Sequence, residues 1–153
     1  MATIGEIDLV ESLGINGSQC LHSHPIKKDK EIKRALGFGC NRMVVDNIEE
    51  MKKFIPYAGQ VELIIRVGFR SKQAVVDLSR KFGCALEELP ILISLAKDYG
   101  INVVGLSFHV GSQSLSSMTQ ANAIRSSIAA MKLMNGVNWK FLDIGGSFPI
   151  SYQ

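Results

Sequence analysis

Residues 101–112 read INVVGLSFHVGS, an almost continuous apolar run that ends in a histidine and a short glycine-serine turn. Valine, isoleucine and phenylalanine in such a run favour a strand that is buried on both faces, as in a parallel sheet. Helical periodicity over residues 86–99 leads into it through Gly100, and a second helical stretch follows over residues 116–134. A helix, a strand and a helix in this order indicate repeated βα units.

The same alternation continues towards both ends of the chain. Further helices are predicted over residues 4–13, 27–36 and 48–54. Strands are predicted near residues 19–24, 42–46, 61–67, 101–109 and 140–145. Parallel strands covered by helices predict an α/β protein, either a doubly wound sheet or part of a (β/α)8 barrel. Strand order separates the two, because a barrel follows chain order around an arc and a doubly wound sheet reverses at a switch point.

Composition restricts the class of protein. The 153 residues are 46% apolar and 20% charged, which is typical of one globular domain and not of a disordered chain. The first residues carry acids where a secretory signal needs bases, and the longest apolar run, residues 89–96, is too short to cross a bilayer. Three widely spaced cysteines support neither a disulfide framework nor a structural zinc site. A cytoplasmic protein without a membrane partner is therefore predicted.

The charge pattern argues against nucleic acid as a partner. The net charge is only +3, from 17 basic and 14 acidic side chains. The one dense basic run, residues 27–34, is interrupted by Asp29 and Glu31. It is predicted to form the solvated face of a helix.

Polar residues gather where the predicted strands end, which is where parallel α/β folds place their working residues. These positions are His22, His24, Asp46, Arg66, residues 109–112 and residues 145–147. Glycine and serine turns expose backbone N–H groups that suit an anion such as phosphate, and an imidazole can stack on an aromatic ring. Each feature also has a structural explanation: a core histidine, a tight turn, or an Arg66 paired with Glu62 or with a helix acid.

The segment His22-Ser23-His24 offers a metal-binding alternative. Alternation along a strand places both imidazoles on one face, as in metal-dependent hydrolases built on barrels, and His109 and Asp143 could complete such a site. No other histidine exists in the chain, so this hypothesis ranks below an anion site, and no metal is predicted.

Two segments together resemble the pyridoxal-phosphate (PLP) decarboxylases that have an alanine-racemase-type barrel. Residues 104–113, VGLSFHVGSQ, are similar to the central signature of that family, and residues 142–149, LDIGGSFP, to its glycine-rich segment one strand later. Residues 2–7, 25–28 and 78–83 fit the family in the expected order. The resemblance covers nearly the whole chain and is greatest to ornithine decarboxylase and its arginine- and lysine-decarboxylating relatives. It implies one domain over residues 1–153, the central portion of a PLP-binding barrel, without the family's C-terminal β domain.

The resemblance also implies roles for individual residues. His109 would stack on the PLP ring, Arg66 would lie near its phenolic oxygen, and Glu6 would be a catalytic residue close to the cofactor's imine. The cofactor phosphate would be held by Ser112, Gly145, Gly146 and Ser147. Ser147 stands where the family usually has a third glycine, and its side chain would crowd the phosphate.

The implied function is PLP-dependent decarboxylation of a basic amino acid, most simply ornithine, for putrescine and polyamine synthesis in a homodimer. The family's Schiff-base lysine would lie upstream of Ala2 and further ligands beyond Gln153, so both ends look cut and the chain alone is expected to be inactive. The alternative is a non-catalytic homologue similar to antizyme inhibitor. The resemblance implies that the residues that select among basic amino acids lie outside residues 1–153.

Overall fold

The fold is built on one parallel sheet whose strands follow chain order. The computed structural model describes residues 1–69, 81–111 and 117–146. In these ranges the sheet has the order β1-β2-β3-β4, and each neighbouring pair is parallel. The strands are β1 (Arg42–Val45), β2 (Glu62–Val67), β3 (Asn102–Phe108) and β4 (Phe141–Asp143). The order has no switch point, so the predicted arc of consecutive βα units is confirmed and the doubly wound sheet is wrong.

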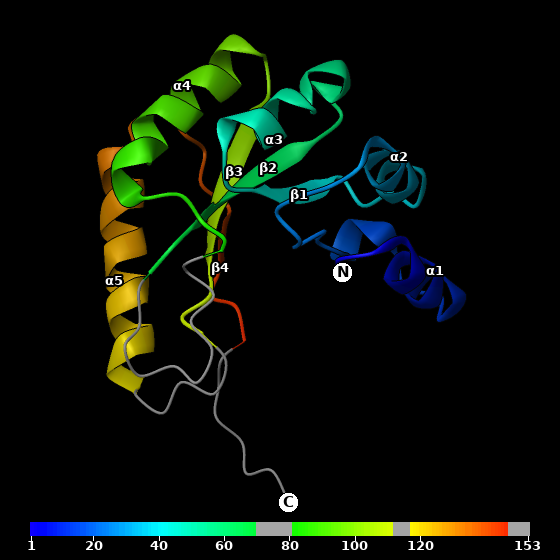
Figure 1. The fold of residues 1–153 in the computed structure, drawn as a ribbon, viewed down its shortest axis with the longest axis horizontal. Coiled ribbons are helices and arrows are strands. Elements are labelled where there is room, and N and C mark those ends of the chain that lie inside the picture. The colour runs from blue at the N-terminus through cyan, green and yellow to red at the C-terminus, as the bar shows by residue number, and fades with distance from the viewer. Residues whose placement is uncertain (70–80, 112–116, 147–153) are drawn as a thin grey trace, which may run out of the picture.

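The helices lie around the sheet in the same order as the strands (Figure 1). They are α1 (Ile4–Ser12), α2 (Asp29–Gly37), α3 (Ile48–Lys52), α4 (Leu89–Asp98) and α5 (Ser117–Leu133). Short 3₁₀ turns are η1 (Gly17–Gln19), η2 (Ile55–Tyr57) and η4 (Leu86–Glu88). The described residues include no helix that is both long and apolar enough to cross a membrane.

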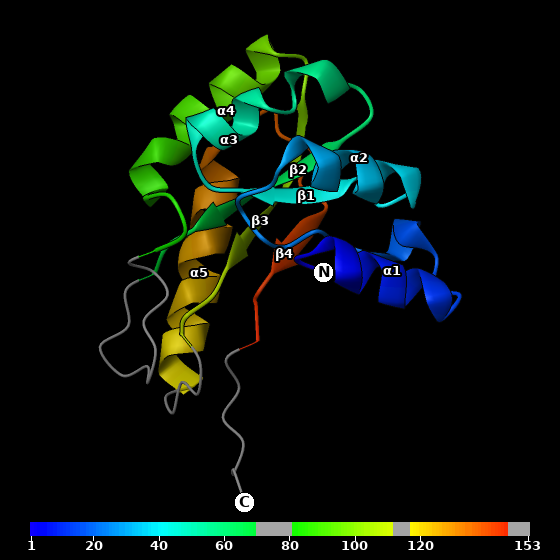
Figure 2. The same ribbon diagram turned by 45° about the vertical axis from the view of Figure 1, so that its right-hand side comes forward.

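The sheet buries both of its faces, as its apolar strands require. The outer face packs against the helices in the main core, to which Met43, Ile65, Leu106 and Phe108 belong. The inner face holds a separate cluster of Val44, Ile64 and Val104, with Leu21 and Phe141 packed against it. Figure 2 shows the described helices placed around the curved strands, as in one sector of a barrel.

The predicted strand at residues 19–24 is reduced to a single parallel bridge between His22 and Met43. The His22 N–H donates to Arg42 O at 3.0 Å, and the Val44 N–H donates to His22 O at 2.9 Å. The 3₁₀ turn η1, capped by the Asn16 side chain, occupies the start of the segment, and Pro25 lacks the N–H that would extend the pairing. The prediction therefore placed the segment correctly and overestimated its regular length.

Lys27 contradicts the prediction that the basic run is wholly solvated, because only 1% of this residue is exposed. Its ammonium group donates to the carbonyl oxygens of His24 (2.8 Å), Pro25 (3.1 Å) and Val44 (2.5 Å). Glu50 Oε1 accepts the Lys27 backbone N–H at 2.8 Å and lies 3.6 Å from Nζ. Burial lowers the pKa of Lys27 to about 8, against the opposing effect of Glu50, so the ammonium is charged at neutral pH. This buried cation ties the turn before α2 to β1 and α3.

The burial of His22 makes the stability of the fold depend on pH. The residue is fully buried, and neither ring nitrogen has a hydrogen-bond partner within the described residues. Burial, followed by the charge of Lys27, lowers the pKa of His22 to about 4. Protons bind more readily to His22 in the unfolded chain, so stability falls as the pH drops from 6.5 towards 4.

We expect the free energy of unfolding to fall by about 2 kcal/mol between pH 7 and pH 4.5 through His22 alone. Urea denaturation of the wild type and of His22→Phe at both pH values measures this contribution as the difference between their pH dependences. Equal pH dependence in the two proteins would contradict the assignment.

Candidate functional site

A pocket of about 500 Å³ opens at the carboxyl ends of β2, β3 and β4. Its polar lining comes from Arg66, Ser107, His109, Asp143, Gly145 and Gly146. Residues 20, 21 and 23 and Met1 form the facing wall. Four of the predicted site residues, namely Arg66, His109, Gly145 and Gly146, thus line a single pocket.

Strand register explains why these side chains meet. Arg66 pairs with Ser107 across β2 and β3, and Ser107 pairs with Asp143 across β3 and β4, so the three form one row facing the pocket. The register between β2 and β3 shifts by one residue after Leu63. Leu63 pairs with Val103, but Ile64 pairs with Gly105 and not with Val104. This irregularity turns Ser107 towards Arg66, as a β-bulge re-aims the side chains that follow it.

Arg66 presents its positive charge to the pocket. Glu62, the partner considered from sequence, pairs with Arg42 at 3.4 Å and with Lys140 at 2.5 Å. Within the described ranges the Arg66 guanidinium makes no hydrogen bond or ion pair, and its carbon Cζ lies 5.2 Å from the centre of the Phe82 ring. Burial lowers the pKa of Arg66, but an arginine stays protonated in a protein. Its donors are therefore available to an anion.

Phe82 supports Arg66 from a segment that folds back onto β2. The Cys84 N–H donates to Arg66 O at 2.9 Å, and the Gly83 N–H donates to Asp46 Oδ2 at 3.0 Å. The Phe82 ring also packs edge-on against His24, with ring centres 5.6 Å apart. Phe82 was not predicted as a site residue, because no local sequence pattern indicates that this loop packs against an arginine.

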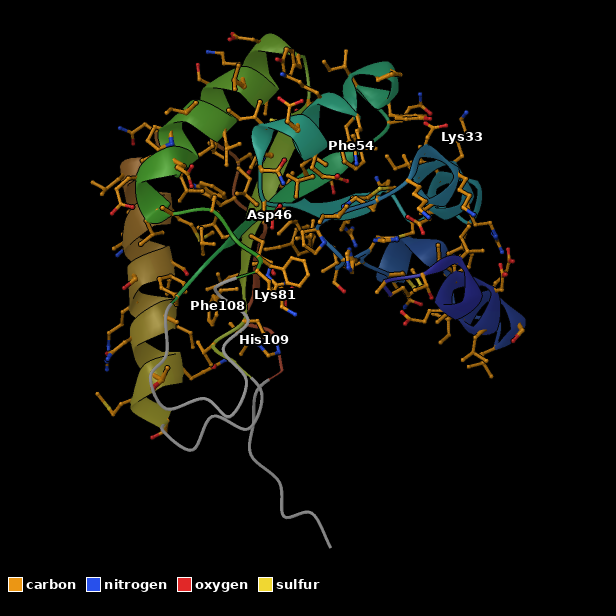
Figure 3. The ribbon with its side chains drawn as sticks, in the orientation of Figure 1. Lys33, Asp46, Phe54, Lys81, Phe108 and His109 are labelled. Atoms are coloured by element: carbon orange, nitrogen blue, oxygen red, sulfur yellow. The ribbon has the colours of Figure 1, made fainter. Side chains whose placement is uncertain are left out.

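His109 offers a neutral ring. It lies just beyond β3 on the side opposite Phe108 (Figure 3). The Gly111 N–H donates to His109 Nδ1 at 3.1 Å, so this nitrogen is unprotonated and the proton of a neutral imidazole is on Nε2. Burial lowers the pKa of His109, as does the charge of Arg66, while Asp143 raises it. An uncharged imidazole in this position is suited to packing against a flat ligand ring.

The glycine turn after β4 is packed tightly against the end of β3. Gly145 has a φ of +65°, and a Cβ there would lie 2.6 Å from Phe108 O and 3.2 Å from His109 Cδ2. Its N–H donates to Asp143 Oδ1 at 2.9 Å. Gly146 is exposed, with open space where a Cβ would be, and its N–H makes no hydrogen bond within the described ranges. Gly146 therefore offers its amide to a ligand, whereas Gly145 shapes the turn.

Three predicted site residues are not placed in the pocket. Glu6 lies in the first turn of α1, where its carboxylate accepts the Ala2 N–H at 2.5 Å and its own N–H donates to the Thr3 hydroxyl. It does not line the pocket. Ser112 and Ser147 lie outside the described residues.

The metal-binding alternative finds no support in the described part of the chain. His22 pairs with Met43 and is buried without a polar partner there, while His24 packs on Phe82. No group of three or more histidine, cysteine or acidic side chains in these ranges could hold a metal ion.

Comparison with known proteins identifies the relatives of this chain. Residues 1–153 match the family described as pyridoxal-dependent decarboxylase, pyridoxal binding domain. The lysine/ornithine decarboxylase of Selenomonas ruminantium is 34% identical over 98% of this chain and 39% of its own length. Antizyme inhibitor 2 of Xenopus laevis is 31% identical over 94% of this chain and 32% of its own length.

Solved structures agree with these relatives. The crystal structure of lysine/ornithine decarboxylase from Vibrio vulnificus, complexed with putrescine, has a TM-score of 0.89 and 41% identity, over 99% of this chain and 40% of that one. The chain thus spans about a third to two fifths of the length of the relatives named. On sequence, on fold and on the matched domain, the chain belongs to the pyridoxal-dependent decarboxylases.

Proposed function

We propose that the pocket holds pyridoxal 5′-phosphate and that the chain provides this cofactor site to a decarboxylase of a basic amino acid. The observation that carries the proposal is the row of Arg66, Ser107 and Asp143, with His109 and Gly146 beside it, around one pocket. The match to a pyridoxal-binding domain over residues 1–153 supports the same ligand.

The residues present fit the chemical groups of the cofactor. PLP carries a phosphate, a flat ring and a phenolic oxygen. A guanidinium that makes no hydrogen bond or ion pair in the described ranges, an exposed Gly146 N–H and a neutral imidazole match these groups in charge and shape. Arg66 would favour the ionised phenolic oxygen, His109 would pack against the ring, and Gly146 would donate to the phosphate. Ser112, Ser147 and Glu6 keep the phosphate-binding and catalytic roles that the resemblance implies.

The bound cofactor supplies an electron sink for the electron pair left when a carboxylate departs. The residues of this chain bind and orient it. His109 limits tilting of the ring, and Leu21, which packs against the inner apolar cluster and lines the pocket, shields part of its wall from water. The fixed cation of Arg66 holds the phenolic oxygen in its ionised form.

The substrate and assembly are proposed from the relatives. Their names include lysine and ornithine, and one solved structure contains putrescine, so we propose a basic amino acid such as ornithine as substrate and a diamine as product. We further propose a homodimer in the cytoplasm. The non-catalytic alternative is favoured by one observation, the match to an antizyme inhibitor.

The cofactor role can be tested with His109→Ala. Pyridoxine 5′-phosphate is a suitable probe, because it keeps the ring and phosphate of PLP and lacks the aldehyde that reacts with surface lysines. We expect the variant to bind it about three- to tenfold more weakly in a fluorescence titration, since the packing surface for the ring is lost. Leu133→Ala, which alters an exposed side chain of α5 outside the pocket lining, is the control. Equal affinity of His109→Ala and wild type would contradict the stacking role.

We propose that the chain by itself does not catalyse decarboxylation. No lysine of the described residues lines the pocket, and a covalent link to one lysine is how such enzymes fix the cofactor. Incubation with PLP, borohydride reduction and peptide mass mapping should show only partial, scattered labelling. Stoichiometric labelling of one lysine, together with carbon dioxide released from ornithine, lysine or arginine, would overturn this expectation.

A further inference from the structure

Asp143 connects three parts of the pocket with one carboxylate. Its Oδ2 accepts the hydroxyl proton of Ser107 on β3 at 2.8 Å, and its Oδ1 accepts the N–H of Gly145 at 2.9 Å. Asp143 is the last residue of β4 and faces the pocket beside Ser107. The Asp143 side chain therefore holds β4, β3 and the turn at Gly145 in fixed positions relative to one another.

The hydrogen bond to Gly145 decides which amide of the turn faces a ligand. Gly145 is held in the left-handed region, against Phe108 O and the His109 ring, with its N–H directed at Asp143. The next amide, that of Gly146, is left without a partner in the described ranges and lies at the exposed side of the turn. Without the carboxylate, the Gly145 N–H would have no acceptor there and the turn would lose its anchor.

The charge of Asp143 does not by itself explain its position. A carboxylate beside an anion site opposes the binding of phosphate, although Arg66 in the same row offsets part of this repulsion. Both of its oxygens are already used as hydrogen-bond acceptors. The useful property of Asp143 is thus its shape and its two acceptors, which an asparagine nearly reproduces.

We propose that Asp143 is a positioning residue for anion binding, which presets the Gly145–Gly146 turn so that the Gly146 amide points at the phosphate group. The proposal rests on the proposed function of the pocket. Asp143 itself does not touch the ligand; it acts through the backbone of the turn and through Ser107.

Two substitutions separate geometry from charge. In Asp143→Asn the amide oxygen still accepts from Gly145, and the amide nitrogen donates to the Ser107 hydroxyl, which can turn to accept. In Asp143→Ala both bonds are lost. We expect Asp143→Ala to bind pyridoxine 5′-phosphate about tenfold more weakly, and Asp143→Asn to bind within about threefold of wild type or more tightly. A loss in Asp143→Asn as large as that in Asp143→Ala would show that the charge matters and would overturn the proposal.

Hydrogen exchange of the Gly145 amide, followed by NMR, tests the same proposal without any ligand. We expect exchange about tenfold faster in Asp143→Ala and near the wild-type rate in Asp143→Asn. A wild type that binds no probe would refute the proposed function, whereas unchanged Gly145 exchange in Asp143→Ala would refute the positioning role. If Asp143→Ala fails to fold, Asp143→Leu replaces it, because leucine has a branched side chain of similar shape but offers no hydrogen-bond acceptor. We expect the same loss of affinity, about tenfold, in Asp143→Leu, and an affinity equal to that of wild type would contradict the proposal.

Discussion

Replacing Lys27 by methionine is expected to lower the free energy of unfolding by about 3–5 kcal/mol, because it removes one partner of a buried ion pair. Methionine fills a similar volume but donates no hydrogen bond. The carbonyl oxygens of His24, Pro25 and Val44 would each lose a donor in the protein interior. Glu50, only 3% exposed, would lose the nearby ammonium and keep Lys53 as its cation. Urea denaturation at pH 7 measures the change.

Lys30 provides the matched control. It lies in the same basic run and is exposed, so Lys30→Met should change the free energy of unfolding by less than about 0.5 kcal/mol. The double variant Lys27→Met with Glu50→Gln should lose less stability than the sum of the two single variants, since either change alone already removes the interaction between the two side chains. A Lys27→Met protein as stable as Lys30→Met would show that the buried ammonium contributes nothing.

Gly145→Ala is expected to remove the anion site. The left-handed backbone at φ +65° costs a residue with a Cβ about 1–2 kcal/mol. The new methyl group would also lie 2.6 Å from Phe108 O, so the turn must move away from β3 and from His109. We expect the affinity for pyridoxine 5′-phosphate to fall more than about tenfold, which corresponds to about 1.4 kcal/mol. Fluorescence titration measures the affinity, and a thermal melt verifies that the variant is folded.

Gly146→Ala is the control for this prediction. A Cβ at this position meets no described protein atom within 4 Å and the backbone N–H is retained, so stability should stay close to the wild-type value and any loss of affinity should be smaller than in Gly145→Ala. If alanine at both positions gave the same loss, steric crowding of the ligand would explain the result better than distortion of the turn.

Much of the fold could be predicted from the sequence because its strands are short apolar runs, each bounded by glycine, proline or a helix cap. The order of β1 to β4 followed from consecutive crossovers and was confirmed. The segment around His22 and the end of β4 were less regular than predicted. The strand predicted to end at residue 145 ends at Asp143, and Gly145 has a positive φ that does not fit a strand.

The candidate site was predicted in part. Arg66, His109 and the glycine turn lie at strand ends, which can be read from the sequence, and they line the pocket. Ser107 was missed as a site residue, and Asp143 was considered only as a ligand in the metal-binding alternative, since the meeting of Ser107 with Arg66 depends on the register shift after Leu63. Alternation backwards from His109 could have suggested Ser107, because it shares the face of that histidine.

Lys27 was missed for a different reason. The residues that follow it, Lys28 to Lys30, are charged and exposed, and only the approach of β1 and α3 buries Lys27. Local charge patterns report the average environment of a segment. They do not show which side chain of a charged run is buried and donates hydrogen bonds to carbonyl groups in the interior.

The most direct test of the account is an NMR titration of the isotope-labelled chain with pyridoxine 5′-phosphate, compared with pyridoxine, which lacks the phosphate. We predict saturable shifts of the Ser107, His109 and Gly146 amides, and binding of pyridoxine that is at least about tenfold weaker, because the phosphate contacts are lost. Equal binding of the two compounds would contradict the account. Shifts confined to the opposite end of the sheet, around Lys97 and Lys140, would contradict it as well.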